Sequence, residues 1–202
     1  MKDKVYLYPI WIRLWHWLNA LLFLALMVTG LCLQYSSSEY SIISFRYAVS
    51  IHNITGIVLC AAFVFFLFGN RFTSNGTYYQ FHLRGMLERV MKQFRYYSFG
   101  IFKHENAPYP ISIERKFNPL QKISYVIIMY VLMPIVILTG VALFFPDILP
   151  SKIFGASGIH IIDLLHITTG FILSIFMIVH IYFCTIGKTP LANFKSMFDG
   201  YH

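Results

Sequence analysis

Four of the eight histidines in this chain lie inside long apolar segments, where an ionisable ring is unusual. They are His16, His52, His166 and His180. A polar ring is costly in a hydrocarbon environment, so a histidine in a bilayer-length apolar segment is by default a candidate for function. The other four are expected in solvated loops or at the membrane surface, and these are His82, His104, His160 and His202.

The spacing of the four histidines resolves them into two pairs. His166 and His180 are fourteen residues apart, which is close to four turns and about 21 Å on an ideal helix, so they point the same way at two depths. Counted from the ends of their apolar segments, His16 and His180 lie near one membrane face, and His52 and His166 lie near the other. The sequence therefore predicts two layers, each with one histidine from each of two helices.

Two imidazoles that face each other from different helices are a typical ligand set for a haem iron. Two haems stacked through a helix bundle would need four such rings in two layers. Zinc prefers three or four ligands at one centre, whereas each layer here offers two. A histidine proton relay does not explain the pairing by depth, and hydrogen bonding between helices is the remaining structural interpretation. The pattern favours two bis-histidine haems.

A Thr-Gly pair occurs in each of the four apolar segments. The pairs are Thr29-Gly30, Thr55-Gly56, Thr139-Gly140 and Thr169-Gly170. By the same counting, all four lie in the outer half of the membrane. Gly56 and Gly170 each follow a histidine by four residues, on the same helix face, where the missing side chain lets a flat macrocycle approach the backbone. Close helix packing through small residues is the alternative, and we favour it for Gly30 and Gly140.

The stretch RLWHW, residues 13–17, surrounds the first of these histidines. Arg13 lies one turn before His16, where its guanidinium can meet a carboxylate at the membrane face. A haem propionate and an anionic lipid headgroup are both candidates for that partner. The tryptophans in and beside this stretch are typical of an interfacial aromatic anchor.

The composition indicates whether the apolar segments lie in lipid or in the core of a soluble protein. Hydrophobic residues make up 57% of the 202 residues and charged residues 12%, with a mean hydropathy of +0.63. A soluble domain is usually about half apolar and about one quarter charged, so an integral membrane protein is predicted. The first apolar segment is too long for the hydrophobic region of a signal peptide, and we expect it to be retained as a span.

Four apolar stretches are long enough to cross about 30 Å of hydrocarbon, which takes roughly 20 helical residues. They cover about residues 11–33, 45–68, 123–145 and 159–186. The predicted fold is all-α, a four-transmembrane-helix bundle in which residues 1–202 form one membrane domain. The N-terminal residues up to Arg13, the loop 70–122 and the C-terminus hold fourteen of the sixteen lysines and arginines, which places all three in the cytoplasm.

The formal net charge of +8 follows from this asymmetry. Because the basic residues bracket the spans, they are expected to meet anionic lipid rather than nucleic acid. Within the loop, residues 84–102 carry apolar side chains at helical spacing opposite basic ones. This predicts an amphipathic helix on the membrane surface, with docking of a partner or cover for a cofactor pocket as alternatives.

Together these motifs resemble the membrane di-haem b-type cytochrome subunits of formate dehydrogenases, nickel–iron hydrogenases and thiosulfate reductases. The likeness covers nearly the whole chain: R-x-x-H-W in the first span, H-x-x-x-G in the second, and H-x-x-x-G with a further histidine in the fourth. The resemblance implies that His52 and His166 share a haem near the periplasm. It implies that His16 and His180 share one near the cytoplasm, and counting by depth gives the same pairs independently.

The stretch KFNPLQK, residues 116–122, precedes the third span. The resemblance implies that Asn118 donates a hydrogen bond to a carbonyl of menaquinone or ubiquinone beside the cytoplasmic haem, with Gln121 as a helper one turn away. From the residues alone, Asn118 before Pro119 is equally typical of a helix N-cap with proline in the first turn.

The resemblance implies a subunit of the bacterial cytoplasmic (inner) membrane with two haem b groups. It would carry electrons between the quinone pool and a periplasmic iron–sulfur or multihaem partner subunit. One alternative is a quinol oxidase that acts alone and passes electrons to a soluble acceptor, and another is a haem-free membrane anchor for a periplasmic enzyme. A measurement of haem content distinguishes the haem-free anchor from both cytochromes. Co-purification of a redox subunit distinguishes the electron-transfer subunit from the quinol oxidase that acts alone.

Overall fold

Four long helical spans form the body of the protein in the computed structural model, which describes residues 5–35, 42–80, 84–187 and 189–202. The spans are α1 (Ile10–Tyr35), α2 (Phe45–Phe72), a third span from Pro119 to Phe144, and α6 (Gly158–Cys184). Each is long and apolar enough to cross a membrane, which confirms the four predicted spans. His82 lies outside the described residues.

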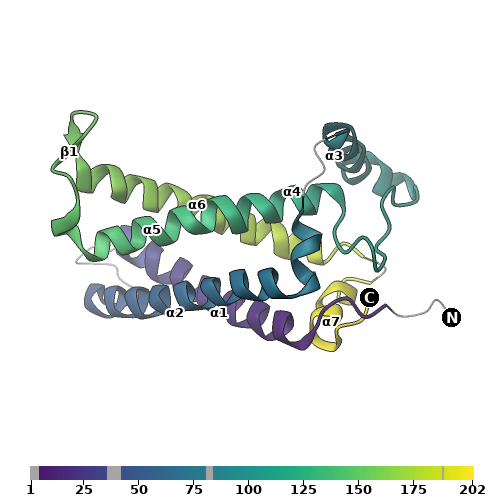
Figure 1. Ribbon diagram of the computed structural model, residues 1–202, viewed down its shortest axis with the longest axis horizontal. Helices are drawn as coiled ribbons and strands as arrows, with labels where there is room; N and C mark the ends of the chain where they lie inside the picture. The colour runs from purple at the N-terminus through teal and green to yellow at the C-terminus, as the bar shows by residue number, and fades with distance from the viewer. Residues whose placement is uncertain (1–4, 36–41, 81–83, 188) are drawn as a thin grey trace.

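The spans lie side by side along the length of the bundle (Figure 1). Helix α1 packs mainly against α2, and the third span packs mainly against α6. A narrow apolar core fills the middle of the bundle and consists of Leu59, Phe63, Ile128, Met133 and Leu173. Many other apolar side chains on the spans point outward, as expected for helices whose outer surface contacts lipid tails instead of water.

The third span is one continuous helix with a wider turn in its middle. It consists of α4 (Pro119–Ile127), a π-helical turn η4 (Ile128–Leu132) and α5 (Met133–Phe144). Pro134 lies in the first turn of α5 and has no N–H to offer the carbonyl one turn earlier. A π turn accommodates such a gap in the hydrogen-bond ladder without breaking the helix.

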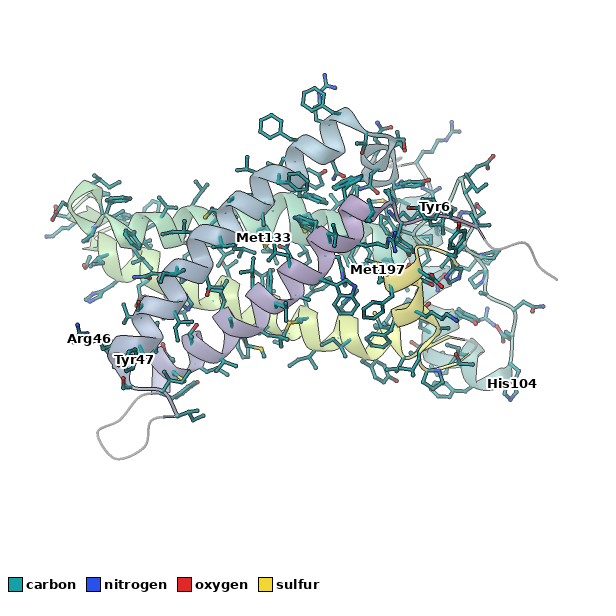
Figure 2. All side chains as sticks on the ribbon, turned by 90° about the horizontal axis from the view of Figure 1, so that it is seen from below. Tyr6, Arg46, Tyr47, His104, Met133 and Met197 are labelled. Atoms are coloured by element: carbon teal, nitrogen blue, oxygen red, sulfur yellow. The ribbon has the colours of Figure 1, made fainter. Side chains whose placement is uncertain are left out.

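The first described residues, from Val5, and the C-terminus lie at the same end of the bundle (Figure 1), which we call the terminal end. It also holds η1 (Ser74–Tyr79), α3 (Met86–Arg95), η2 (Tyr96–Gly100), η3 (Ile101–Lys103) and α7 (Ala192–Asp199). In Figure 2, Tyr6, His104 and Met197 lie at this end, Arg46 lies at the other, and Met133 lies between them.

The opposite end, which we call the hairpin end, carries η5 (Pro146–Ile148) and a short antiparallel hairpin. The hairpin pairs β1 (Lys152–Ile153) with β2 (Ala156–Ser157). Its two turn residues, Phe154 and Gly155, have φ values of 50° and 84°. Positive φ at both central positions is the geometry of the tight turns that match the twist of a two-stranded hairpin.

Helix α3 confirms the amphipathic helix predicted within residues 84–102. Its apolar residues Leu87, Met91 and Phe94 are exposed, whereas Gln93 is buried. The helix contacts α4, and its exposed surface carries charged residues such as Lys92 beside these apolar ones. Helix α7 is not foreseen in the sequence. It packs on α1, where Trp17 donates a hydrogen bond to the carbonyl of Met197 at 3.1 Å.

Candidate functional site

Two pairs of histidines face each other inside the bundle, one at each end. At the hairpin end, His52 of α2 and His166 of α6 have ring centroids 6.2 Å apart. At the terminal end, His16 of α1 and His180 of α6 have ring centroids that are also 6.2 Å apart. The structure therefore brings together the same two pairs that the sequence places at equal depths.

The distance between the two ring centroids of each pair fits two imidazole ligands on opposite sides of one metal ion. Metal–imidazole bonds of about 2 Å put the centroids of two rings on opposite sides of one metal roughly 6 Å apart. Both pairs have this spacing. No cluster of three or more His, Cys, Asp or Glu side chains suited to a metal ion occurs among the described residues. Two opposed imidazoles and a planar group between them remain the arrangement that fits.

Threonine hydroxyls from the neighbouring helices contact the hairpin-end pair. The Oγ1 atom of Thr29 lies 2.9 Å from Nδ1 of His52, and the Oγ1 atom of Thr139 lies 3.0 Å from Nδ1 of His166. Each hydroxyl donates its own hydrogen to the carbonyl four residues earlier in its helix, at 2.7 Å in both cases. The threonine oxygen is then an acceptor for the Nδ1–H, and Nε2 keeps its lone pair.

The four glycines of the Thr-Gly pairs fall into two kinds. A Cβ atom on Gly30 would lie 3.6 Å from the His52 ring, and one on Gly140 would lie 3.1 Å from the His166 ring. Both glycines therefore lie against a histidine ring. At Gly140 the missing side chain allows the close helix packing that the sequence favours, whereas at Gly30 a Cβ atom would make an ordinary contact. A Cβ atom on Gly56 or Gly170 would meet nothing within 4 Å. The open space beside them has the character that a flat macrocycle requires.

The terminal-end pair has different surroundings. The Nδ1 atom of His180 lies 3.5 Å from the hydroxyl of Tyr125, and the ring of Phe176 stacks on the His180 ring at 5.9 Å. Across the bundle, Nδ1 of His16 is buried and has no hydrogen-bond partner in the described part of the chain. The two layers thus share their ring spacing but differ in how the rings are hydrogen-bonded.

Arg13 lies one turn from His16, and part of its guanidinium is already engaged. Its Nη1 donates a hydrogen bond to the backbone carbonyl of Phe198 in α7, a contact that the sequence does not predict. Its Nε is buried and, within residues 5–35, 42–80, 84–187 and 189–202, has no partner. Two orphaned nitrogens, on Arg13 and His16, therefore lie in one layer, and an anionic group there would satisfy the guanidinium.

Asn118 and Gln121 form a capping box at the start of α4. The Oδ1 of Asn118 accepts from the Gln121 backbone N–H at 2.9 Å, and the Gln121 Oε1 accepts from the Asn118 N–H at 3.2 Å. The Nδ2 of Asn118 also donates to the Tyr97 hydroxyl at 2.8 Å. The N-cap interpretation therefore describes how the structure uses Asn118. A side-chain amide has two N–H donors, so one remains for another acceptor.

Lys116, the first residue of the KFNPLQK stretch, is a buried cation, and the sequence does not predict its burial. It is 3% exposed, its Nζ donates to the Asn75 Oδ1 at 2.7 Å, and it lies 4.7 Å from the centroid of the Tyr8 ring. Asn75 in turn donates to the Asn70 Oδ1 at 2.7 Å, and Asn70 donates to the Tyr130 hydroxyl at 2.9 Å. Burial lowers the pKa of Lys116 from its usual 10.5 to about 8.

An apolar groove of about 280 Å³ lies between the third span and α6. Its wall includes Ser124 and Ile128 on one side and Phe176 and Val179 on the other. Phe176 is the residue that stacks on His180. The groove therefore reaches the immediate neighbourhood of the terminal-end histidine pair.

Comparison with known proteins shows which family this sequence matches. The model of a family described as prokaryotic cytochrome b561 matches residues 7–200. The "Putative cytochrome YdhU" of Escherichia coli (strain K12) is 38% identical over 200 residues, which are 99% of this chain and 75% of that protein. The matched residues include all four spans and both histidine pairs.

Proposed function

The chain belongs to the prokaryotic cytochrome b561 family, and from this premise we propose that it holds two haem b groups and carries electrons between them and a quinone. As a member of this family it is a multi-pass bacterial membrane protein and a b-type cytochrome. Two histidine pairs with the same 6.2 Å ring separation carry the proposal. Bound haem supplies one-electron redox chemistry at its iron.

The ligand assignment follows from which rings face each other. His52 and His166 hold the haem at the hairpin end, and His16 and His180 hold the haem at the terminal end. Because His166 and His180 are fourteen residues apart on the continuous helix α6, the two sites are separated by about 21 Å along the bundle. Two histidines would hold each haem, which favours electron transfer over oxygen binding there.

Other residues of the bundle provide space, an apolar interior and a positive charge for the two haems. Gly56 and Gly170 leave open space beside the hairpin-end pair. The apolar core between the layers, which includes Leu59, Met133 and Leu173, excludes water from the interior. At the terminal end, the unpaired Nε of Arg13 is available to a haem propionate. The protein thus supplies ligands, room and a counter-charge.

The quinone site belongs at the terminal end in this proposal. Asn118 keeps one amide hydrogen for a quinone carbonyl, and Gln121 acts by holding Asn118 in place through the capping box. The apolar groove between the third span and α6 offers a path for an isoprenoid tail. The quinone is menaquinone or ubiquinone, since both present the carbonyl and the tail that these features would bind.

The excess of lysine and arginine in the termini and the 70–122 loop supports a cytoplasmic terminal end in the inner membrane. The hairpin end then faces the periplasm, where an iron–sulfur or multihaem partner subunit would exchange electrons with the nearer haem. The exposed apolar residues of α3, Leu87, Met91 and Phe94, are placed to rest on the lipid surface. Membership in a b-type cytochrome family disfavours the alternative of a haem-free anchor.

An experiment on the quinone site uses the two roles of Asn118. Asn118→Asp keeps the oxygen that caps α4, because aspartate and asparagine are equally good N-caps, but it removes the amide donor. A short-chain menaquinol or ubiquinol should reduce the haems of the purified wild-type protein. In Asn118→Asp, this reduction should slow about tenfold, the equivalent of about 1.4 kcal/mol for a lost hydrogen bond, with haem content unchanged. Failure of both quinols to reduce the wild type would contradict the quinone assignment.

A further inference from the structure

The bond between a threonine hydroxyl and a histidine ring occurs twice at the hairpin end, with the same geometry. Thr29 of α1 binds His52 of the following span, and Thr139 of α5 binds His166 of the following span, at 2.9 and 3.0 Å. The two threonines are 2% and 5% exposed. Each is followed by a glycine that lies against the same histidine ring. Two helix pairs that are far apart in sequence therefore present their histidines in the same way.

The direction of these hydrogen bonds is set by the other partners of the atoms. Because each threonine hydrogen is donated to a carbonyl of its own helix, the oxygen can only accept from the ring. For His166 a second acceptor agrees, since its Nδ1 also lies 3.1 Å from the backbone carbonyl of Val136, and a carbonyl cannot donate. Both rings therefore carry their proton on Nδ1, and Nε2 is unprotonated.

We propose that Thr29 and Thr139 are positioning residues of the hairpin-end haem, which fix the tautomer of His52 and His166 and lower the reduction potential of that haem. An acceptor on the outer N–H of a ligating histidine orients the ring and makes it a more basic ligand. A more basic ligand stabilises the oxidised iron, which carries the higher charge, over the reduced iron. The iron gains or loses one electron, and the Nδ1 proton stays on the ring in both states. The inference rests on the proposed two-haem function.

The terminal-end pair lacks this arrangement and so provides an internal reference. The Nδ1 of His16 has no partner among the residues that the structure describes. The Nδ1 of His180 lies 3.5 Å from the Tyr125 hydroxyl, at the limit of hydrogen bonding. A change in the hairpin-end threonines should therefore alter one haem and leave the other as it was.

The test is a visible redox titration of the full-length protein with its haems bound, after haem content has been measured. Thr29→Val and Thr139→Val keep the shape of the side chain and remove the acceptor oxygen, whereas Thr29→Ser and Thr139→Ser keep the oxygen. Each valine variant should raise the reduced-to-oxidised ratio of one haem at a fixed potential, by roughly tenfold for Thr29→Val, where tenfold is about 59 mV for one electron. The rise should be smaller, roughly threefold, for Thr139→Val, because His166 keeps the Val136 carbonyl as a second acceptor. The serine variants should match the wild type.

Thr169→Val is the matched control, because Thr169 is also buried in α6 and makes no hydrogen bond to a histidine within the described residues. Loss of one haem in the valine variants and its retention in the serine variants would also support positioning. The inference is overturned if the valine variants keep both potentials, if both haems shift equally, if Thr169→Val shifts as much, or if serine fails to restore the wild-type behaviour. A wild-type protein with fewer than two haems would contradict the proposed function itself, and this inference with it.

Discussion

His52 and His166 face each other from α2 and α6 with their ring centroids 6.2 Å apart. His16 and His180 repeat this separation at the other end of the bundle. Helix α6 contributes one ring to each pair, so the rotation of this single helix aligns both sites at once. Fourteen residues are close to a whole number of helical turns, which is why one straight helix can serve two layers.

The open space beside Gly170 gives a prediction about haem binding. A Cβ atom at this position would meet nothing within 4 Å, so Gly170→Leu has room in the protein itself and should not destabilise the fold by a clash. The side chain should instead occupy the space that the macrocycle needs, and haem content should fall from two per chain to about one. Gly170→Ala, with a smaller side chain, should lose less. Full haem content in Gly170→Leu would show that no macrocycle lies beside this glycine.

Lys116 gives a prediction about pH and stability. Its pKa falls from 10.5 to about 8 on folding, so between these values the unfolded chain binds more protons, and stability rises with pH. Relative to Lys116→Met, the free energy of unfolding of the wild type should therefore increase by about 3 kcal/mol between pH 7 and pH 11, at 1.36 kcal/mol for each pKa unit. Denaturant unfolding in detergent at several pH values measures this change.

The control for that titration is Lys152→Met, at an exposed lysine in the hairpin. Because this side chain is exposed, the variant controls for the loss of one lysine charge from the protein as a whole. A constant difference between the wild type and Lys116→Met would contradict the burial of the Lys116 ammonium.

Asn75 gives a related prediction, because its Oδ1 accepts from the Lys116 ammonium at 2.7 Å. Asn75→Ala should leave the buried charge without that partner and destabilise the protein by about 2–4 kcal/mol. In the Lys116→Met background, the same substitution should cost about 1–2 kcal/mol less, which a double-mutant cycle measures. Equal costs in the two backgrounds would mean that the two side chains act independently.

The sequence was sufficient to predict the features that depend on helix geometry. The four spans follow from bilayer thickness, and the pairing of His16 with His180 and of His52 with His166 follows from a fixed rise per residue. The structure shows both pairs facing each other, while their role as ligands stays a prediction. Asn118 had two interpretations, and the structure shows the N-cap directly.

Features that depend on how distant segments fold together could not be predicted. The bonds of Thr29 and Thr139 to histidines require the rotation of one helix against the next, which a single sequence does not specify. Lys116 becomes buried because Tyr8 from the N-terminal segment and Asn75 from η1 close over it. Helix α7 is too short and too polar to be predicted as a membrane span. Its contact with α1 depends on Trp17, which the sequence indicates only as an aromatic anchor.

Haem content of the detergent-purified protein and of two single variants tests the central claim most directly. The pyridine haemochrome assay should give two haem b per wild-type chain, and a redox titration should resolve two waves. His52→Ala and His16→Ala should each retain about one haem and lose a different wave, because each removes a ligand from a different pair. One haem or none in the wild type, or loss of the same wave in both folded variants, would contradict the assignment of two haems to these two histidine pairs.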